Sequence, residues 1–445
     1  MINKLSLKLH RDEQFFELLK SSSISFTLRI VGIILGYAFV LLVTQGYGAE
    51  AMGIFTLTFT FLQIISIISR LGMDTVILRF IGESIAENNR KNIVIDIYKK
   101  ILYLTLPMSL FITIIAYTIT PIVCEYILNK PELITAFQLA SFGVLPMTIL
   151  FINREALRGL KIIILYSFFS SIALPLFASL IVLFLLYFST DNLMPIYAQL
   201  TAIIIAGIMS IFLWKYHVSQ LTNKSTSKKE TNISFKKILK TSLPMMLASS
   251  LFIVMSWTDI LILGAFRSTE EVGIYSVALK VSLLTSIVLM SINSIAAPKF
   301  AEIWGKKDLQ GLKNIVKQST KLIFLLSLPI LLFILFFPEF ILSFFGEQFE
   351  LGATALIFLA LGQFFNAISG SVGMLLTMTG HQIIYQNILI VTIIINIFLN
   401  LLWVTEYGLV GVAMATMVST ILWNTLMGYF VWKKFGFIAF YIGVK

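Results

Sequence analysis

Residues 162–188, IIILYSFFSSIALPLFASLIVLFLLYF, contain no charged side chain. The hydrocarbon core of a bilayer is about 30 Å thick, so a helix needs about 20 apolar residues to cross it. This stretch is long enough to cross once. Of the 445 residues of the chain, 58% are hydrophobic and 12% are charged, which is too little charge to cover a water-soluble protein of this size. The sequence therefore predicts an integral membrane protein.

Apolar runs of similar length recur along the whole chain. Each run predicts one membrane-spanning helix, so we expect an all-α polytopic membrane protein of about twelve transmembrane helices. The runs are residues 22–44, 52–78, 101–122, 133–153, 162–188, 195–214, 241–264, 272–297, 320–337, 351–378, 383–402 and 410–432. Two of them are long enough to bend, at Pro175 and at Gly370.

Positive charges are concentrated in alternate connections between the predicted helices. Of the 33 Lys and Arg residues, 28 lie in connections on one side, 2 lie on the other side (Lys130 and Arg267), and 3 lie inside spans. Cytoplasmic connections of membrane proteins carry an excess of Lys and Arg. We therefore expect both termini in the cytoplasm, and no nucleic-acid binding, because topology accounts for most of the net charge of +11.

The two halves of the chain resemble each other. Met52-Gly-Ile-Phe-Thr-Leu matches Val272-Gly-Ile-Tyr-Ser-Val, and Leu104-Thr-Leu-Pro matches Leu326-Ser-Leu-Pro at almost the same offset along the chain. Six-helix units that start on the same side form parallel repeats related by an axis along the membrane normal. The expected parts are a cytoplasmic amphipathic N-terminus (1–21), an N-lobe (22–214), a polar cytoplasmic linker (215–240), a C-lobe (241–432) and a cytoplasmic tail (433–445).

Charged residues inside the first two predicted spans are candidates for a functional site, because a charge at the bilayer centre costs about 2.5–3.5 kcal/mol on insertion scales. Arg29 is also close enough to the cytoplasmic boundary to extend toward the headgroups. Arg70 lies four residues before Asp74, so the two can line a cavity or form a self-neutralised structural pair. Small and polar residues share the face of Arg29: Ser22, Ser25, Gly32 and Gly36.

Lys280 in the eighth span has no acidic residue three or four positions away in its own helix. Its depth implies either a wet cavity or a partner from another helix, for which Asp259 of the seventh span is the candidate. Under the first alternative Lys280 binds a ligand, and under the second it forms a structural bridge. Serines share the predicted face of Lys280: Ser276, Ser291 and Ser294.

Arg154 and Arg158 lie at the cytoplasmic end of the fourth span, where they are either topology signals or an entry site for an anionic headgroup. With one cysteine and three scattered histidines, the sequence predicts no metal site and no cofactor. It also lacks a P-loop and the H-E-x-x-H, G-x-S-x-G and D-x-D motifs, so we expect a transporter without catalytic residues.

The repeat pattern, the Tyr47-Gly48 turn ahead of Gly53, the Gly72 element before Arg79 and the Arg158-Gly159 end of the fourth helix resemble the polysaccharide flippases. These are O-antigen and capsule repeat-unit exporters, in the superfamily that includes the multidrug-and-toxin extruders. The resemblance implies a MATE-like, V-shaped arrangement of two lobes around a central cavity. It also implies a substrate in which an oligosaccharide is linked to a polyprenyl (undecaprenyl-type) pyrophosphate, and possible association with polymerase and other polysaccharide-assembly proteins.

The resemblance also assigns expected roles to charged residues. Lipid II flippases of the same superfamily use cavity cations on helices 1, 2 and 8, and Arg29, Arg70 and Lys280 stand on those helices here. Multidrug relatives, which bind cations, characteristically carry an acid in helix 1, where this chain has Arg29. Two alternatives remain: an ion-coupled multidrug antiporter that relies on Asp74 and Asp259, and, more distantly, a membrane glycosyltransferase or polymerase.

Overall fold

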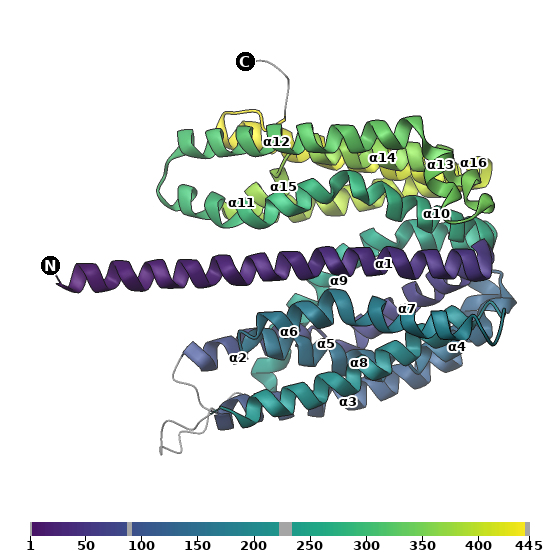
Figure 1. Ribbon diagram of the computed structural model, residues 1–445, viewed down its shortest axis with the longest axis horizontal. Coiled ribbons are helices and arrows are strands. Elements are labelled where there is room, and N and C mark those ends of the chain that lie inside the picture. Colours follow the sequence, from purple (N-terminus) through teal and green to yellow (C-terminus); the bar gives the residue numbers. More distant parts are fainter. Residues whose placement is uncertain (1, 87–90, 222–233, 441–445) are drawn as a thin grey trace. The chain divides into compact units, whose positions relative to one another are not determined.

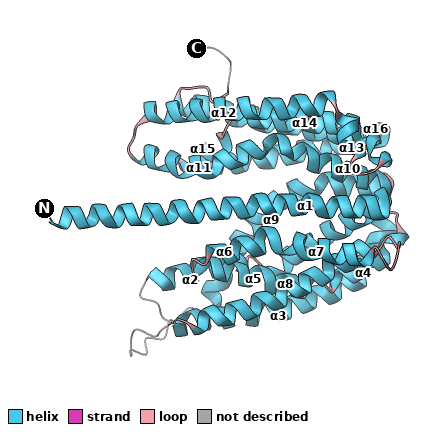
Figure 2. Cartoon of the chain, viewed as in Figure 1, coloured by secondary structure: helices cyan, strands magenta, loops and turns pink. Residues whose placement is uncertain are grey.

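The computed structural model describes residues 2–86, 91–221 and 234–440. For residues 2–23, 85–86, 237, 243–245, 247–256, 294–295 and 298 it describes the backbone only. Helices make up almost all of this part of the chain, which contains no β-strand (Figure 2). The all-α class predicted from the sequence is therefore confirmed. Residues 222–233 of the predicted linker and residues 441–445 of the predicted tail lie outside the described residues.

The helices are long and apolar enough for many membrane crossings. Among the described residues, eight helices qualify as spans, or nine if the bent pair Pro131–Ser141 and Val144–Gly159 is one span. Two of the eight, Ile24–Arg70 with 47 residues and Gln382–Phe435 with 54, are about twice as long as one crossing needs.

Each of these two long helices is interrupted by a glycine with non-helical dihedral angles. Gly48 has a φ of 83° and Gly408 a φ of 55°, a region that glycine adopts without a steric penalty. Divided at these glycines, the two helices supply four spans. With α9, Phe235–Phe266, the observed helices cover all twelve predicted runs.

The chain divides into two compact units, of which the first comprises residues 1–46 and 58–253. Within this unit α5 packs against α2, α3 and α8 (Figure 1). Apolar side chains from these helices, including Ile77, Ile97, Leu150 and Trp214, form its main core. The helices are α1 (Ile2–Arg70), α2 (Met73–Ala86), α3 (Lys91–Ile122), α4 (Ile134–Ser141), α5 (Val144–Gly159), α6 (Ile163–Ser167), α7 (Ala173–Leu185), α8 (Met194–Ser219) and the first part of α9.

The second unit comprises residues 47–57 and 254–445. Within it α14 packs against α10, α12 and α16, and Phe300, Leu312, Leu375 and Val431 belong to a buried core. The helices are the end of α9, α10 (Thr269–Ser282), α11 (Ile287–Gly305), α12 (Leu309–Phe336), α13 (Pro338–Ser343), α14 (Ala353–Ile368), α15 (Val372–Met378) and α16 (Gln382–Phe435).

Several spans are interrupted within the bilayer-length runs. The bend expected at Gly370 is present, since α14 ends at Ile368 and Gly370 has a φ of 70°. The irregularity expected at Pro175 lies just before it, as a π-helical turn at Phe168–Ile172. Pro175 lies inside the continuous helical segment Ile163–Leu185, three residues after this turn, and it has no N–H to donate to the carbonyl of Ser171.

The two matched motifs of the repeat, which begin at Met52 and at Val272, pack against each other within the second unit. A methyl group added to Gly53 would lie 1.7 Å from the carbonyl oxygen of Thr269, and one added to Gly273 would lie 2.0 Å from that of Ala49. The contact is reciprocal, because Ala49 and Thr269 are separated by the same offset as Gly53 and Gly273. This glycine seam explains why residues 47–57 pack with the second unit, although they lie within the range predicted for the N-lobe.

Candidate functional site

Arg70 is the last residue of α1, beside a break in the helix. Leu71 and Gly72 have φ angles of 51° and 73°, and α2 begins directly after them. A methyl group on Gly72 would lie 2.5 Å from the backbone oxygen of Ser242, so the close approach of α9 requires a glycine. The break places Arg70 at the C-terminus of one helix and Asp74 in the first turn of the next, where the helix dipoles favour a cation and an anion, respectively.

The Arg70 guanidinium is deeply buried and only partly satisfied. Its side chain is 5% exposed, and Nε donates a hydrogen bond of 3.1 Å to the carbonyl oxygen of Ser66. Nη1 lies 3.6 Å from Oδ2 of Asp74, so the ion pair expected from their spacing is present. Nη1 nevertheless has no hydrogen-bond partner. Arg70 therefore keeps donor capacity that its own helix pair does not use.

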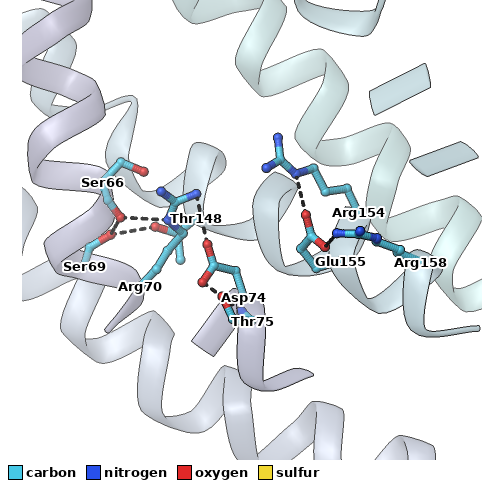
Figure 3. Close-up of polar contacts among 9 residues, drawn as sticks. All are labelled: Ser66, Ser69, Arg70, Asp74, Thr75, Thr148, Arg154, Glu155 and Arg158. Atoms are coloured by element: carbon cyan, nitrogen blue, oxygen red, sulfur yellow. Dashed lines mark hydrogen bonds and ion pairs between the residues drawn. The ribbon is translucent and has the colours of Figure 1, made fainter. Parts of the chain in front are cut away.

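A second group of charged residues lies on one face of α5. Phe151, Arg154, Glu155 and Arg158 are spaced three and four residues apart, as helix geometry requires for a shared face. Glu155 Oε1 accepts a hydrogen bond of 3.3 Å from Arg154 Nε, and Oε2 accepts one of 3.4 Å from Arg158 Nη1 (Figure 3). The Arg158 guanidinium also lies 4.7 Å from the ring centroid of Tyr166. Glu155 therefore accepts a hydrogen bond from each of the two arginines on this face.

The aromatic ring of Phe151 joins the two groups. The guanidinium carbon of Arg70 lies 3.8 Å from the ring centroid, and that of Arg154 lies 3.8 Å from the same centroid. Two guanidinium groups this close to one centroid must lie on opposite faces of the ring, in cation–π contact. Arg70, Asp74, Phe151, Arg154, Glu155 and Arg158 thus form one arginine cluster, which includes two predicted headgroup residues and a predicted cavity cation. Phe151 and Glu155 were not among the predicted site residues.

Arg29 lies in the same compact unit but outside the arginine cluster. Ser25 accepts a hydrogen bond from Ser167 with an oxygen–oxygen distance of 3.0 Å, and a methyl group on Gly32 would lie 2.4 Å from the carbonyl oxygen of Ser171. The small-residue face predicted beside Arg29 therefore packs against the fifth span. The side chain of Arg29 is exposed and forms no ion pair within the described part of the chain.

Lys280 lies in the last turn of α10, just before a 3₁₀ turn at Leu283–Ser286. It is partly buried, and the helix continues past it through that turn into α11. The hydroxyl of Ser276, expected on the face of Lys280, donates to the carbonyl oxygen of Gly273 and accepts a hydrogen bond from Thr56. Ser276 therefore takes part in the glycine seam.

Asp259 of α9 is buried among uncharged donors. Its Oδ1 accepts a hydrogen bond of 2.8 Å from Asn400, and its Oδ2 accepts bonds of 2.6 Å from Thr416 and 3.1 Å from Tyr275. The bridge to Lys280 considered from the sequence is not among the ion pairs of the described residues. The carboxylate is thus held by α10 and α16 through neutral groups.

Comparison with solved structures defines the class of fold. An inward-facing multidrug resistance MATE family transporter of the MOP superfamily superposes with a TM-score of 0.73 over 93% of this chain and 98% of the other, at 14% identity. The lipid II flippase MurJ, in an inward closed conformation, gives a TM-score of 0.71 over 93% and 87% of the two chains, at 15% identity. The chain therefore has the MATE-like fold of polytopic membrane transporters.

Sequence comparison identifies the family. The family model described as polysaccharide biosynthesis protein matches residues 18–304, and the MatE family model matches residues 244–402. Because the first match covers more than half of the chain, the protein belongs to the polysaccharide biosynthesis protein family.

Curated relatives from archaea and bacteria match at about one quarter identity. An uncharacterized membrane protein of Methanocaldococcus jannaschii is 25% identical over 87% of this chain and 91% of its own. A probable low-salt glycan biosynthesis flippase of Haloferax volcanii is 26% identical over 40% of this chain and 39% of its own. A putative O-antigen transporter of Shigella flexneri is 25% identical over 51% and 53%.

Proposed function

We propose that the protein is a flippase that moves a polyprenyl-pyrophosphate-linked oligosaccharide repeat unit across the cytoplasmic membrane. The observation that carries this proposal is the polysaccharide biosynthesis family match over residues 18–304. The names of the relatives from H. volcanii and S. flexneri, a glycan biosynthesis flippase and an O-antigen transporter, support the same substrate class. Transport proceeds by alternating access between the N-lobe (22–214) and the C-lobe (241–432), with both termini in the cytoplasm.

The charged residues of the spans suit an anionic substrate. A pyrophosphate diester carries about two negative charges, and a cation about 4 Å away contributes roughly 4 kcal/mol at an effective dielectric constant of 20, before the desolvation cost is subtracted. Arg29, Arg70 and Lys280 are the cations that we assign to the transport path. Arg154 and Arg158 are the residues that we assign to the capture of the headgroup from the cytoplasmic side.

A multidrug antiporter is the second candidate, and Asp259 is the observation that favours it. A buried carboxylate within the region matched by the MatE family model, residues 244–402, is a possible site for ion coupling. Arg29 argues against a cationic drug as the substrate, because it puts a positive charge where the multidrug relatives carry an acid. The two candidates differ in the sign of the charge on the transported molecule.

Reconstitution into vesicles tests the proposal. We expect the purified protein to redistribute a fluorescent polyprenyl-pyrophosphate oligosaccharide between leaflets and to leave it chemically unchanged. Fluorescent phosphatidylcholine in the same vesicles should stay in its original leaflet. Redistribution of a cationic dye without redistribution of the lipid-linked sugar would support the antiporter instead, and a covalent change in the sugar would contradict a transporter without catalytic residues.

A further inference from the structure

We propose that Arg70, Phe151 and Arg154 form a diphosphate-selective binding site in which Phe151 is the spacer that fixes the distance between two guanidinium groups. The inference rests on the proposed function, since it assigns the diphosphate group of the proposed substrate to particular side chains. Lipid-linked and free diphosphates share the recognised chemistry.

The geometry of the stack is fixed by the ring. Each guanidinium carbon lies 3.8 Å from the Phe151 centroid, so the separation of the two carbons is at most twice that distance. Two like charges repel at this separation. Asp74 beside Arg70 and Glu155 beside Arg154 offset that repulsion and keep both arginines on the ring. The cluster with Arg158 holds three cations against two carboxylates, which leaves one excess positive charge.

Both guanidinium groups keep unused donors, of which Nη1 of Arg70 faces Oδ2 of Asp74 at 3.6 Å without a hydrogen bond. Arg70 uses Nε on the Ser66 carbonyl, and its buried Nη1 has no hydrogen-bond partner. Arg154 uses Nε on Glu155, and within the described residues its two terminal amino groups have no hydrogen bond. Nη1 of Arg70 is buried, and buried donors without partners are rare in proteins, whereas the Arg154 side chain is 20% exposed. Terminal guanidinium edges are the part that binds phosphate oxygens in a bidentate manner, so these donors indicate a phosphate ligand.

The ring also explains why the ligand should be a diphosphate. A single phosphate that pairs with one guanidinium in the bidentate manner lies at the edge of that group, near its plane, and the second guanidinium, on the other face of the ring, is then out of its reach. A diphosphate lying along the edge of the ring has two tetrahedral groups, so it can place one against each guanidinium. The arrangement should therefore bind a diphosphate in preference to a monophosphate.

Glu155 is a positioning residue for this site. It binds the Nε side of Arg154 and one terminal nitrogen of Arg158, and its own side chain is 11% exposed. Because its contact with Arg154 is on the inner edge of the guanidinium, the outer edge stays available to a ligand. The Glu155 carboxylate binds Nε of Arg154, so it need not compete with a phosphate for the two terminal nitrogens of that residue.

The test measures binding to the full-length protein in detergent micelles with three probes: farnesyl diphosphate, farnesyl phosphate and inorganic pyrophosphate. We expect farnesyl diphosphate to bind at least about tenfold more tightly than farnesyl phosphate, because it gains a second charge-assisted pair. Competition by inorganic pyrophosphate would show that the diphosphate is recognised without its lipid, and a lack of competition would show that the lipid-linked form is the ligand. Equal affinity for farnesyl diphosphate and farnesyl phosphate would overturn the proposal.

Variants separate the spacer from general effects on folding. Phe151→Leu removes the ring but keeps an apolar side chain, so the preference should fall below about threefold, whereas Phe151→Tyr keeps the ring and should keep the preference. Phe111→Leu, at an exposed position of α3, is the matched control and should bind as the unaltered protein does. If Phe151→Leu aggregates, Arg154→Lys, which keeps the charge and loses the planar fork, decides the question. Retention of the full preference by a folded Phe151→Leu or Arg154→Lys protein would refute the spacer role.

The binding result and the vesicle result fail independently. A preference that depends on Phe151 in a protein that moves no lipid-linked sugar would leave the site intact and refute the flippase. Sugar redistribution by a protein whose diphosphate preference is unchanged in Phe151→Leu would refute the site and leave the flippase intact.

Discussion

At the scale of single residues, the charges inside the helices are compensated in different ways. Arg70 has an acid within 3.6 Å, a carbonyl oxygen and an aromatic face, whereas Asp259 is surrounded only by neutral donors. Lys280 is partly buried inside the span Thr269–Asn293, just before its 3₁₀ turn at Leu283–Ser286. Removing any one of these charges therefore has a different consequence for its surroundings.

The first prediction concerns Lys280. Because Asp259 takes its hydrogen bonds from Asn400, Thr416 and Tyr275, Lys280→Ala should not leave an orphaned carboxylate there, and the protein should remain in the membrane at near-normal levels. Export should fall at least about tenfold if the charge binds the substrate, and Lys280→Arg should retain more export than Lys280→Gln. Complementation of surface polysaccharide, with membrane levels measured in parallel, checks both expectations.

A double change distinguishes the structural bridge from this expectation. If Lys280 and Asp259 form a bridge, Lys280→Ala should deplete the protein and Lys280→Ala with Asp259→Ala should restore it. We expect no such rescue. Full export by the Lys280→Ala protein would remove Lys280 from the transport path.

Sequence spacing predicted some of these contacts and could not predict others. Arg70 and Asp74 are four residues apart, so helix geometry alone indicates their pairing. The partners of Asp259 include Asn400, which is 141 residues away, and only the packing of α16 against α9 brings the two together. Likewise Phe151 belongs to the arginine cluster because α1 and α5 converge there, although its spacing from Arg154 and Glu155 is visible in the sequence.

At the scale of elements, hydropathy predicted where helices lie but not where they are interrupted. Hydropathy does not show the break at Leu71 and Gly72, because the run 52–78 continues across it, and only the resemblance to the polysaccharide flippases draws attention to Gly72 as the end of the second helix. At the break the backbone of α9 approaches Gly72 so closely that a side chain there would clash with it. A tertiary contact of this kind is not encoded in the local pattern of the run. Gly370 was predictable because glycine within a long run is a common point of bending.

The second prediction concerns the glycine seam between residues 47–57 and α10. Gly53→Ala places a methyl group 1.7 Å from the Thr269 carbonyl, so the two helix backbones must separate, and we expect the melting temperature in detergent to fall by several degrees. Gly273→Ala should act in the same way, because its methyl group meets the carbonyl of Ala49.

Gly82→Ala in α2 is the matched control for this experiment. Apart from its chain neighbours and the nearby backbone of its own helix, no described atom lies within 4 Å of the methyl group that it would add, and alanine favours a helix over glycine by about 1 kcal/mol. Its melting temperature should therefore stay constant or rise. A Gly53→Ala protein as stable as the Gly82→Ala protein would show that the seam is not closely packed.

At the scale of the whole molecule, the repeat organises both the sequence and the structure. The interruption at Gly48 and the Ser268 cap that begins α10 are separated by the same offset as Met52 and Val272, which begin the matching motifs. Two copies of a six-helix unit at almost the same offset predict that each copy starts on the same side of the membrane. The orientation of the first helix then fixes that of every other helix.

The third prediction follows from that constraint and from the bias of 28 positive charges on one side against 2 on the other. We expect alkaline phosphatase fused after Asn223 or after Lys445, both outside the described residues, to be inactive, because the reporter folds only outside the cytoplasm. Fusion after Lys130, in the connection that precedes α4, should be active and serves as the control. Activity at Asn223 with none at Lys130 would invert the whole topology, since an even number of spans separates Asn223 from the N-terminus. Activity at Lys445 and at the Lys130 control, with none at Asn223, would mean that the C-lobe holds an odd number of spans. The parallel-repeat arrangement would then be wrong.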